Sequence, residues 1–319
     1  MRAGSRALSV LSSSLNVHVL KALEDEELLS LNELSQAIGL PPASTMRAYL
    51  KALVEVGAIE RRSESGFASS VSYAIAPGGE KLLAAGDVLQ HWLGLAPGGP
   101  ISLGSTAAKS AVKTLVEAWD ANIVRALAAR PLPLTELHRL IPQISYPTLE
   151  RRLAAMRLVG LVEGQRNGSG RGTPYRATRW LRKAVAPLAA AIAWERGHVP
   201  DPPPLGRLDV EAGFLLVIPL AQFPSSATGV CRLAIETGAG STLRYAGVKL
   251  TLDSGRVSTC VTRLEGEAEA WVVGTPRDWF RWLNGSEDAP IEFGGDTGLG
   301  RTVVEALAEA LAPTPIKVS

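Results

Sequence analysis

The sequence has few residues of the kinds on which most enzymes and secreted proteins depend. Its 319 residues include two cysteines, far apart and outside any C-x-x-C motif. We interpret them as reduced thiols of a cytosolic protein, with a pairing between them left open. The four histidines are scattered and match no metal-binding spacing. Neither a G-x-S-x-G turn nor a Walker phosphate loop is present. We therefore expect no metal, no cofactor and no enzymatic activity.

Long apolar segments are also missing. No apolar run approaches the ~20 residues that a membrane-spanning helix needs. The longest candidate, residues 184–194, is interrupted by Pro187. The N-terminus has no apolar signal core followed by a cleavage site. These absences predict a cytoplasmic protein that does not enter a membrane, and its length predicts about two or three domains.

What the sequence does contain is an internal repeat. Residues 31–60 align without a gap with residues 134–163, at an offset of 103. Apolar positions coincide in the two segments, and so does a glycine followed by a short apolar strand. On either side of these segments the alignment offset changes by one residue, and each change falls in a turn, where insertions are tolerated. A repeat of this length predicts that one small domain is present twice.

The second copy reads as three helices. Residues 121–129 carry apolar side chains at helical spacing, and the prolines that follow end that helix. A second helix opens at Leu134, with Thr135 as its predicted N-cap. A third helix covers about 146–159, with Ser145 as its predicted N-cap.

A β-hairpin follows the third helix. Gly160 is placed to be a left-handed C-cap, and residues 161–163 and 175–177 read as strands around a glycine-rich tip. This order of elements is that of a winged helix-turn-helix, whose third helix fits the DNA major groove. The predicted DNA contacts of this copy are Ser145, Tyr146, Thr148, Arg151 and Arg152 on the helix and Arg166, Arg171 and Arg176 on the hairpin.

The charge distribution favours the second copy as the DNA-binding one. The net charge is −2 over residues 1–120, +9 over 121–200 and −5 over 201–319. A basic segment between two acidic ones is typical of a DNA-contacting module. In the first copy, DNA contact and a purely structural role both stay open, because an acidic run covers residues 24–27. Its candidate contacts are Ser44, Thr45, Arg47 and Lys51.

Two family resemblances follow from these motifs. Residues 115–180 resemble the HxlR branch of winged-helix regulators, through Leu134-Thr135-Glu136-Leu137, Leu149-Glu150-Arg151-Arg152-Leu153 and Val159-Gly160-Leu161-Val162-Glu163. Residues 13–93 resemble the wider winged-helix group, which includes MarR-like regulators. The resemblance implies transcription regulation. It also implies a pseudo-dimer within one chain, because HxlR proteins usually act as homodimers; a homodimer of the whole chain stays open.

The C-terminal third is different in character. Residues 214–220, 229–237, 248–253, 256–263 and 267–273 read as strands, and 276–284 and 302–311 as helices. The glycine cluster at 294–300 reads as a loop. Val248–Gly255, Ala270–Trp279 and Leu283-Asn284-Gly285 resemble the sterol-carrier-protein-2 fold. That resemblance implies an apolar cavity for a hydrophobic molecule, with Phe214, Trp271, Trp279, Phe280 and Trp282 as candidate lining residues.

Together these features predict an α+β protein. Two tandem winged-helix domains, at 1–98 and 108–200, precede an α+β domain at 207–313 with a mainly antiparallel sheet. We expect a regulator that binds double-stranded DNA and responds to a hydrophobic small molecule. One alternative is a protein that sequesters such a molecule without binding DNA. Another is a tandem winged-helix DNA glycosylase, which is disfavoured because no Q-x-Q motif is present.

Overall fold

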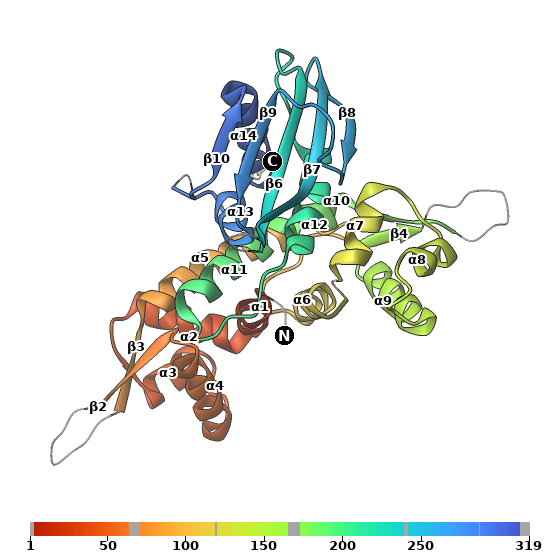
Figure 1. Cartoon of the computed structure of the whole chain (residues 1–319). Helices are drawn as coiled ribbons and strands as arrows, with labels where there is room; N and C mark the ends of the chain where they lie inside the picture. Colours follow the sequence, from red (N-terminus) through yellow and green to blue (C-terminus); the bar gives the residue numbers. More distant parts are fainter. Residues whose placement is uncertain are drawn as a thin grey trace. The chain divides into compact units, whose positions relative to one another are not determined.

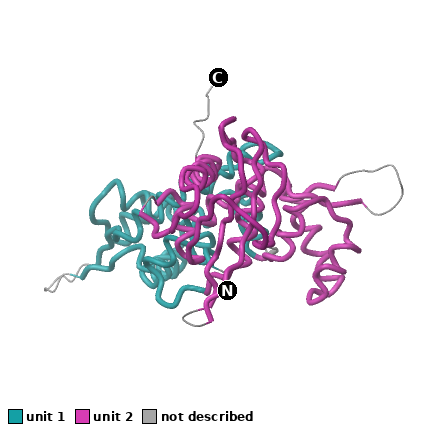
Figure 2. Tube along the Cα trace, turned by 45° about the horizontal axis from the view of Figure 1, so that its top comes forward, with its two compact units in different colours: residues 1–116, 190–203 teal, residues 117–189, 204–319 magenta. Residues whose placement is uncertain are grey.

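The computed structural model describes residues 3–63, 71–118, 120–164, 173–238, 242–286 and 288–312. The chain forms two compact units, coloured separately in Figure 2. Unit 1 comprises Met1–Val116 and Ala190–Pro203, and unit 2 comprises Glu117–Ala189 and Pro204–Ser319. The predicted three-domain division stays a prediction, and each unit is described by itself below.

Unit 1 contains a winged helix. Its sheet has the order β1-β3-β2, with both pairs antiparallel. Helices α2, α3 and α4 precede the β2–β3 hairpin (Figure 1). The elements of the unit are α1 (Ser5–Leu11), α2 (Ser14–Asp25), β1 (Leu29–Ser30), α3 (Leu31–Ala37), α4 (Ala43–Glu55), β2 (Ile59–Ser63), β3 (Val71–Ile75), α5 (Pro77–Gly94), most of α6 (Thr106–Ala118) and the C-terminal part of α11 (Val185–His198).

The core of this winged helix comes from one apolar face of each helix. Leu20, Leu34, Met46 and Leu50 are buried and contribute from α2, α3 and α4. Their spacing along α4 leaves the opposite face of that helix in solvent, as expected for an amphipathic helix. One side of α4 is therefore exposed.

Unit 2 begins with the same order of elements. Three helices and a two-stranded antiparallel hairpin follow one another, and a bridge between Leu132 and Tyr175 extends the hairpin by one short segment. The elements are α7 (Ala121–Ala129), α8 (Leu134–Leu140), α9 (Tyr146–Leu158), β4 (Val162–Gly164), β5 (Tyr175–Ala177), α10 (Arg179–Lys183) and the first turn of α11.

The sequence predicted these elements to within one or two residues, with one wrong cap. Gly160 has φ +86°, so it is the left-handed residue after α9 that was expected. Thr135 is not an N-cap, because α8 already begins at Leu134 and its N-cap is Pro133. Proline is suited to the start of a helix, where its missing N–H costs no internal hydrogen bond.

The rest of unit 2 is built on a five-stranded mixed sheet. The strand order is β10-β9-β6-β7-β8, in which only the β6–β9 pair is parallel (Figure 1). The mainly antiparallel α+β architecture was therefore predicted correctly. The elements are α12 (Arg207–Val217), the 3-10 helix η1 (Ile218–Leu220), β6 (Gly229–Thr237), β7 (Arg244–Asp253), β8 (Arg256–Val261), β9 (Ala270–Gly274), α13 (Pro276–Leu283), β10 (Glu292–Gly295) and α14 (Thr297–Leu311).

Two predictions in this part are wrong. The predicted strand at 214–220 is helical, because α12 continues into η1 there. Every residue of α12 from Val210 to Val217 is buried, so this helix has no polar face and its sequence shows no helical period. The predicted loop at 294–300 instead holds the end of β10 and the start of α14, which the Asp296 side chain caps.

The helices of this part cover one face of the sheet. Phe214 and Trp279 pack edge to face, with ring centroids 4.7 Å apart, and both are fully buried. Leu233 and Val272 point to the same side and are buried as well. The apolar core therefore lies between the sheet and α12, α13 and α14. Over the part of the chain that is described, no helix is long and apolar enough to cross a membrane.

Candidate nucleic-acid interface

Helix α4 presents a polar, cationic surface. Met46, Leu50 and Leu53 anchor its buried side. Ser44 and Arg47 are exposed and Thr45 is half-buried on the other side. Further along that side, exposed Lys51 lies 3.7 Å from Glu55. Arg47 forms no ion pair with any described residue, so its guanidinium is available to a base edge or a phosphate.

Local hydrogen bonds define both the start of α3 and the turn between α3 and α4. A capping box starts α3, in which Ser30 and Glu33 each accept from the other's backbone N–H. The hydrogen bond from the Ser30 backbone lowers the pKa of Glu33 below its usual value. After α3, Gly39 and Leu40 both adopt positive φ, and the Leu40 N–H donates to the Ser35 carbonyl. This turn ends α3 and leads into α4.

The hairpin of unit 1 carries two more arginines. Arg61 and Arg62 are exposed on β2, and Arg62 lies 3.5 Å from Glu60. Such an exposed pair contributes little to stability, so a phosphate can replace the carboxylate at small cost. The tip of this hairpin, residues 64–70, lies outside the described residues.

Helix α9 in unit 2 presents a second candidate surface. Leu149, Leu153 and Met156 form its buried side. Tyr146 is 39% exposed, and Arg151 is exposed and forms no ion pair with any residue in the described ranges. Ser145 is the N-cap residue, as predicted, but its hydroxyl donates to the Thr148 hydroxyl at 2.9 Å instead of capping a backbone N–H.

Arg152 has a different environment from Arg151. Its Nη1 lies 3.2 Å from an Asp120 carboxylate oxygen, and the Arg152 side chain is only 29% exposed. The other carboxylate oxygen of Asp120 accepts from the Asn122 backbone N–H at the start of α7. Arg152 therefore ties α9 to the first turn of α7 and, unlike Arg151, already has a carboxylate partner.

Several basic residues of the segment 121–200 have partners within the fold. Arg176 on β5 lies 2.8 Å from Glu163 on β4, with both side chains about half exposed. Arg182 donates to the backbone carbonyls of Leu215 and Ala128. The predicted contacts Arg166 and Arg171 lie outside the described residues. The net charge of the segment thus overstates how many cations face outward.

The five aromatic candidates for ligand binding fall in three environments. Phe214, Trp279 and Phe280 are core residues, and the Trp279 indole N–H donates to the Ala234 carbonyl at 2.8 Å. Trp282 is half-buried beside Arg301 in a shallow cavity of about 620 Å³. Trp271 is 37% exposed on the sheet face that the helices leave open. The structure therefore does not bring these five residues together.

The described residues also contain no group of three or more His, Cys, Asp and Glu side chains placed to hold a metal ion. Cys231 and Cys260 are both free thiols. The sequence alone had left a pairing between them open, and the structure decides against it.

Comparison with known proteins identifies one domain. Residues 17–63 match the IclR helix-turn-helix domain. The match runs from α2 to the end of β2, so it includes the turn at Gly39 and the exposed helix α4. It supports a DNA-binding transcription regulator of the winged helix-turn-helix class. It falls on the first copy, which the charge argument had ranked second. No curated protein matches the chain.

Proposed function

We propose that this protein is a transcription regulator that contacts double-stranded DNA with the exposed sides of both α4 and α9, and that its C-terminal part binds a small-molecule effector. The HxlR-like and sterol-carrier-like resemblances remain part of this proposal. So do the repeat, the pseudo-dimer and the absence of enzymatic activity.

The observation that carries the proposal is the exposed side of α4. It lies within the IclR-type domain, and it presents Arg47 without a carboxylate partner among the described residues. An arginine at this place on the third helix of a winged helix reaches base edges in the major groove. In the repeat alignment Arg47 falls on Glu150, and the next residue of α9, Arg151, is exposed and likewise unpaired within the described part of the chain.

Effector control is supported by the way unit 2 is assembled. Helix α12 packs on α7, the first helix of the second winged helix, and also on β7 of the large sheet. The C-terminal part and the second winged helix therefore share one core. A ligand that changes the packing of α12 changes the DNA affinity only if the two arrangements of the helix bind DNA differently.

The test is a selection of genomic fragments by the purified protein, followed by gel-shift measurements on the fragment recovered. Arg47→Ala and Arg151→Ala are each expected to weaken binding by about 1–3 kcal/mol if the side chain reads a base. Arg256→Gln is the matched control, because Arg256 is an exposed arginine on β8 and belongs to neither helix. Affinity should also fall steeply with salt concentration. Unchanged affinity in both alanine variants would remove the proposal.

A second candidate function is sequestration of a small molecule without DNA binding. It is favoured by a cleft of about 900 Å³ on the open sheet face of unit 2. This alternative predicts tight ligand binding together with no enriched genomic fragment, so the same selection separates the two functions.

A further inference from the structure

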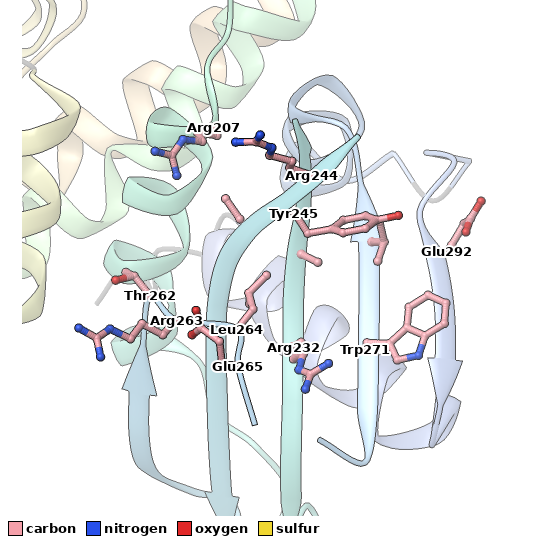
Figure 3. Close-up of a pocket in the computed structure, with 13 residues that line it drawn as sticks. Arg207, Arg232, Arg244, Tyr245, Thr262, Arg263, Leu264, Glu265, Trp271 and Glu292 are labelled. Carbon is pink, nitrogen blue, oxygen red and sulfur yellow. The ribbon is translucent and has the colours of Figure 1, made fainter. Parts of the chain in front are cut away.

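The open face of the large sheet is hollowed into a cleft (Figure 3). Its volume of about 900 Å³ is within the range of small-molecule sites. Side chains of β6, β7, β9 and β10 form the floor, the segment from Thr262 to Glu265 closes one side, and Arg207 at the start of α12 closes an end.

Successive side chains of β6 point to opposite faces of the sheet, which explains why the open face carries a charged residue on the central strand. Cys231 and Leu233 point to the helices and are fully buried. Arg232 and Ala234 point to the opposite face and line the cleft. A charged residue at the centre of the central strand is unusual, because such a position loses hydration unless something else satisfies it.

Arg232 is only partly satisfied by the protein. One terminal nitrogen donates to the Gly266 carbonyl, which holds the β8–β9 segment against the sheet. Its Nε is buried and has no hydrogen-bond partner among the described residues. Arg244 and Arg263, also in the cleft, form no ion pair with a residue in the described ranges. The lining holds four arginines against two glutamates, so the cleft carries an excess of positive charge.

The floor of the cleft includes a flat aromatic surface. Trp271 on β9 pairs with Gly294 on the edge strand β10. Its indole lies directly over that glycine, so that any Cβ at position 294 would collide with the ring. The ring is thereby held against the sheet while staying 37% exposed. Tyr245 on β7, 55% exposed, faces the same cleft (Figure 3).

We propose that this cleft binds a small organic anion with a planar ring, of the aromatic carboxylate class. The ring stacks on Trp271, and the carboxylate pairs with Arg232 and the neighbouring arginines. A planar fork of N–H donors suits a carboxylate, and a fixed indole face suits a flat ring at little entropic cost. Phe214, Trp279 and Phe280, which were predicted to line a ligand cavity, take no part in this site because their side chains lie in the core.

Two glutamates argue against a single-stranded nucleic acid as the occupant. Glu265 and Glu292 stand at opposite sides of the cleft (Figure 3). A phosphate backbone that crosses the sheet would pass one of them, and like charges repel. A compact anion with one charged end avoids both carboxylates.

The cleft is joined to the second winged helix by charged contacts. Arg207 at the end of the cleft lies 3.6 Å from Glu211, and Glu211 lies 2.6 Å from Arg125 on α7. An anion in the cleft competes with Glu211 for Arg207. The role of this ligand as an effector rests on the proposed function, whereas its binding does not.

The test uses isothermal titration calorimetry on the full chain, with 2-naphthoate as the anionic probe and 2-naphthalenemethanol as its neutral match. We expect 2-naphthoate to bind at least about tenfold more tightly than the alcohol. Arg232→Gln and Trp271→Leu should each weaken naphthoate binding by about tenfold or more. Arg256→Gln, outside the cleft, should bind like the wild type. If Arg232→Gln unfolds, Arg244→Gln takes its place, because Arg244 is exposed at the rim.

The proposal is overturned if 2-naphthoate does not bind, if both probes bind equally, or if the cleft variants keep full affinity. Binding of oligo(dT) that is lost in the same variants, without naphthoate binding, would assign the cleft to single strands and also overturn it. Arg47→Ala, defective in DNA binding, should bind naphthoate normally. If the protein binds naphthoate but selects no DNA, the ligand site is supported and the proposed function as a regulator is overturned.

Discussion

The guanidinium of Arg125 lies 2.6 Å from the carboxylate of Glu211, a side chain that is 2% exposed. Arg125 belongs to α7 and Glu211 to α12, so this pair joins the helix-and-hairpin segment at the start of unit 2 to the C-terminal part of the same unit. Arg207 approaches the other carboxylate oxygen at 3.6 Å. One buried anion is thus held between two cations from different parts of the fold.

Loss of Arg125 should destabilise unit 2. Arg125→Met leaves the Glu211 carboxylate buried with the half-exposed Arg207 as its remaining cationic partner. This change should lower the free energy of unfolding by about 3 kcal/mol. Urea denaturation monitored by circular dichroism measures this. In the double variant Arg125→Met/Glu211→Met no buried charge remains, so its loss should be smaller than that of the single variant. A larger loss would contradict the assignment.

The stability of the protein should depend on pH through Glu211. Burial raises the pKa of Glu211 above its ordinary value of 4.5, against the pull of Arg125 and Arg207. The folded state therefore holds this proton more tightly than the unfolded state. Glu211 therefore contributes stability that is fully present below its pKa in the unfolded state. This stability is lost as the pH rises through its pKa in the folded state.

Glu211→Gln isolates this contribution, because glutamine does not titrate. The difference in unfolding free energy, wild type minus Glu211→Gln, should fall as the pH rises from 4.5 upward. Urea titrations at a series of pH values give this difference. A difference that stays constant or grows with pH would show that the carboxyl is not desolvated in the fold.

Two adjacent arginines on α9 should respond differently to truncation. Arg152→Ala removes the contact with Asp120 and should lower the free energy of unfolding by about 1–2 kcal/mol. Arg151→Ala should change it by less than about 0.5 kcal/mol, as surface substitutions do. Thermal or urea unfolding of the two variants measures this difference, which distinguishes a residue that positions α9 from one that is exposed for DNA contact. Equal stability of both would mean that the Arg152–Asp120 contact does not form in solution.

The two thiols should be poorly reactive in the folded protein. Burial and the nearby charge of Asp296 together raise the pKa of Cys231 to about 12, and burial raises the pKa of Cys260 to about 11. Since the thiolate is the reactive form, alkylation at pH 8 should be on the order of a hundredfold slower than in urea. Mass spectrometry of iodoacetamide-treated protein follows each site. Modification of Cys231 as fast as that of a peptide thiol would refute its burial.

Glu195 should be essential for the attachment of α1 in unit 1. Its carboxylate is buried and accepts from the backbone N–H groups of Gly4, Arg6 and Ala7 at 2.6–3.1 Å. Glu195→Ala leaves these donors without an acceptor, so we expect a loss of about 3 kcal/mol in unfolding free energy. Glu195→Gln, which keeps one acceptor oxygen, should lose less. Early hydrogen exchange at α1 in the alanine variant is the second readout.

The local elements of both helix–helix–helix–hairpin segments could be read from the sequence. Capping residues, prolines and a glycine after α9 mark where helices begin and end, and these signals act within a few residues. The helix α12 could not be read, because a helix buried on all sides shows no period. The same limit explains why residues 214–220 resembled a strand.

The candidate site was predictable in part. The exposed side of α4 follows from the helical spacing of Met46, Leu50 and Leu53, which puts Arg47 opposite the core. The tie between Arg152 and Asp120 joins residues 32 positions apart, and no local pattern indicates it. The cleft around Arg232 was missed, although an arginine between two buried apolar residues of one strand was a usable signal.

The sequence by itself determined the two helix–helix–helix–hairpin segments and the α+β character of the C-terminal third, because period and capping are properties of neighbouring residues. Only the tertiary structure decided which arginines are free and which are bound. It also placed Trp271 over Gly294 and the Glu211 carboxylate between Arg125 and Arg207. Such contacts depend on which distant segments meet, and a side chain's availability for DNA or ligand is set by those neighbours.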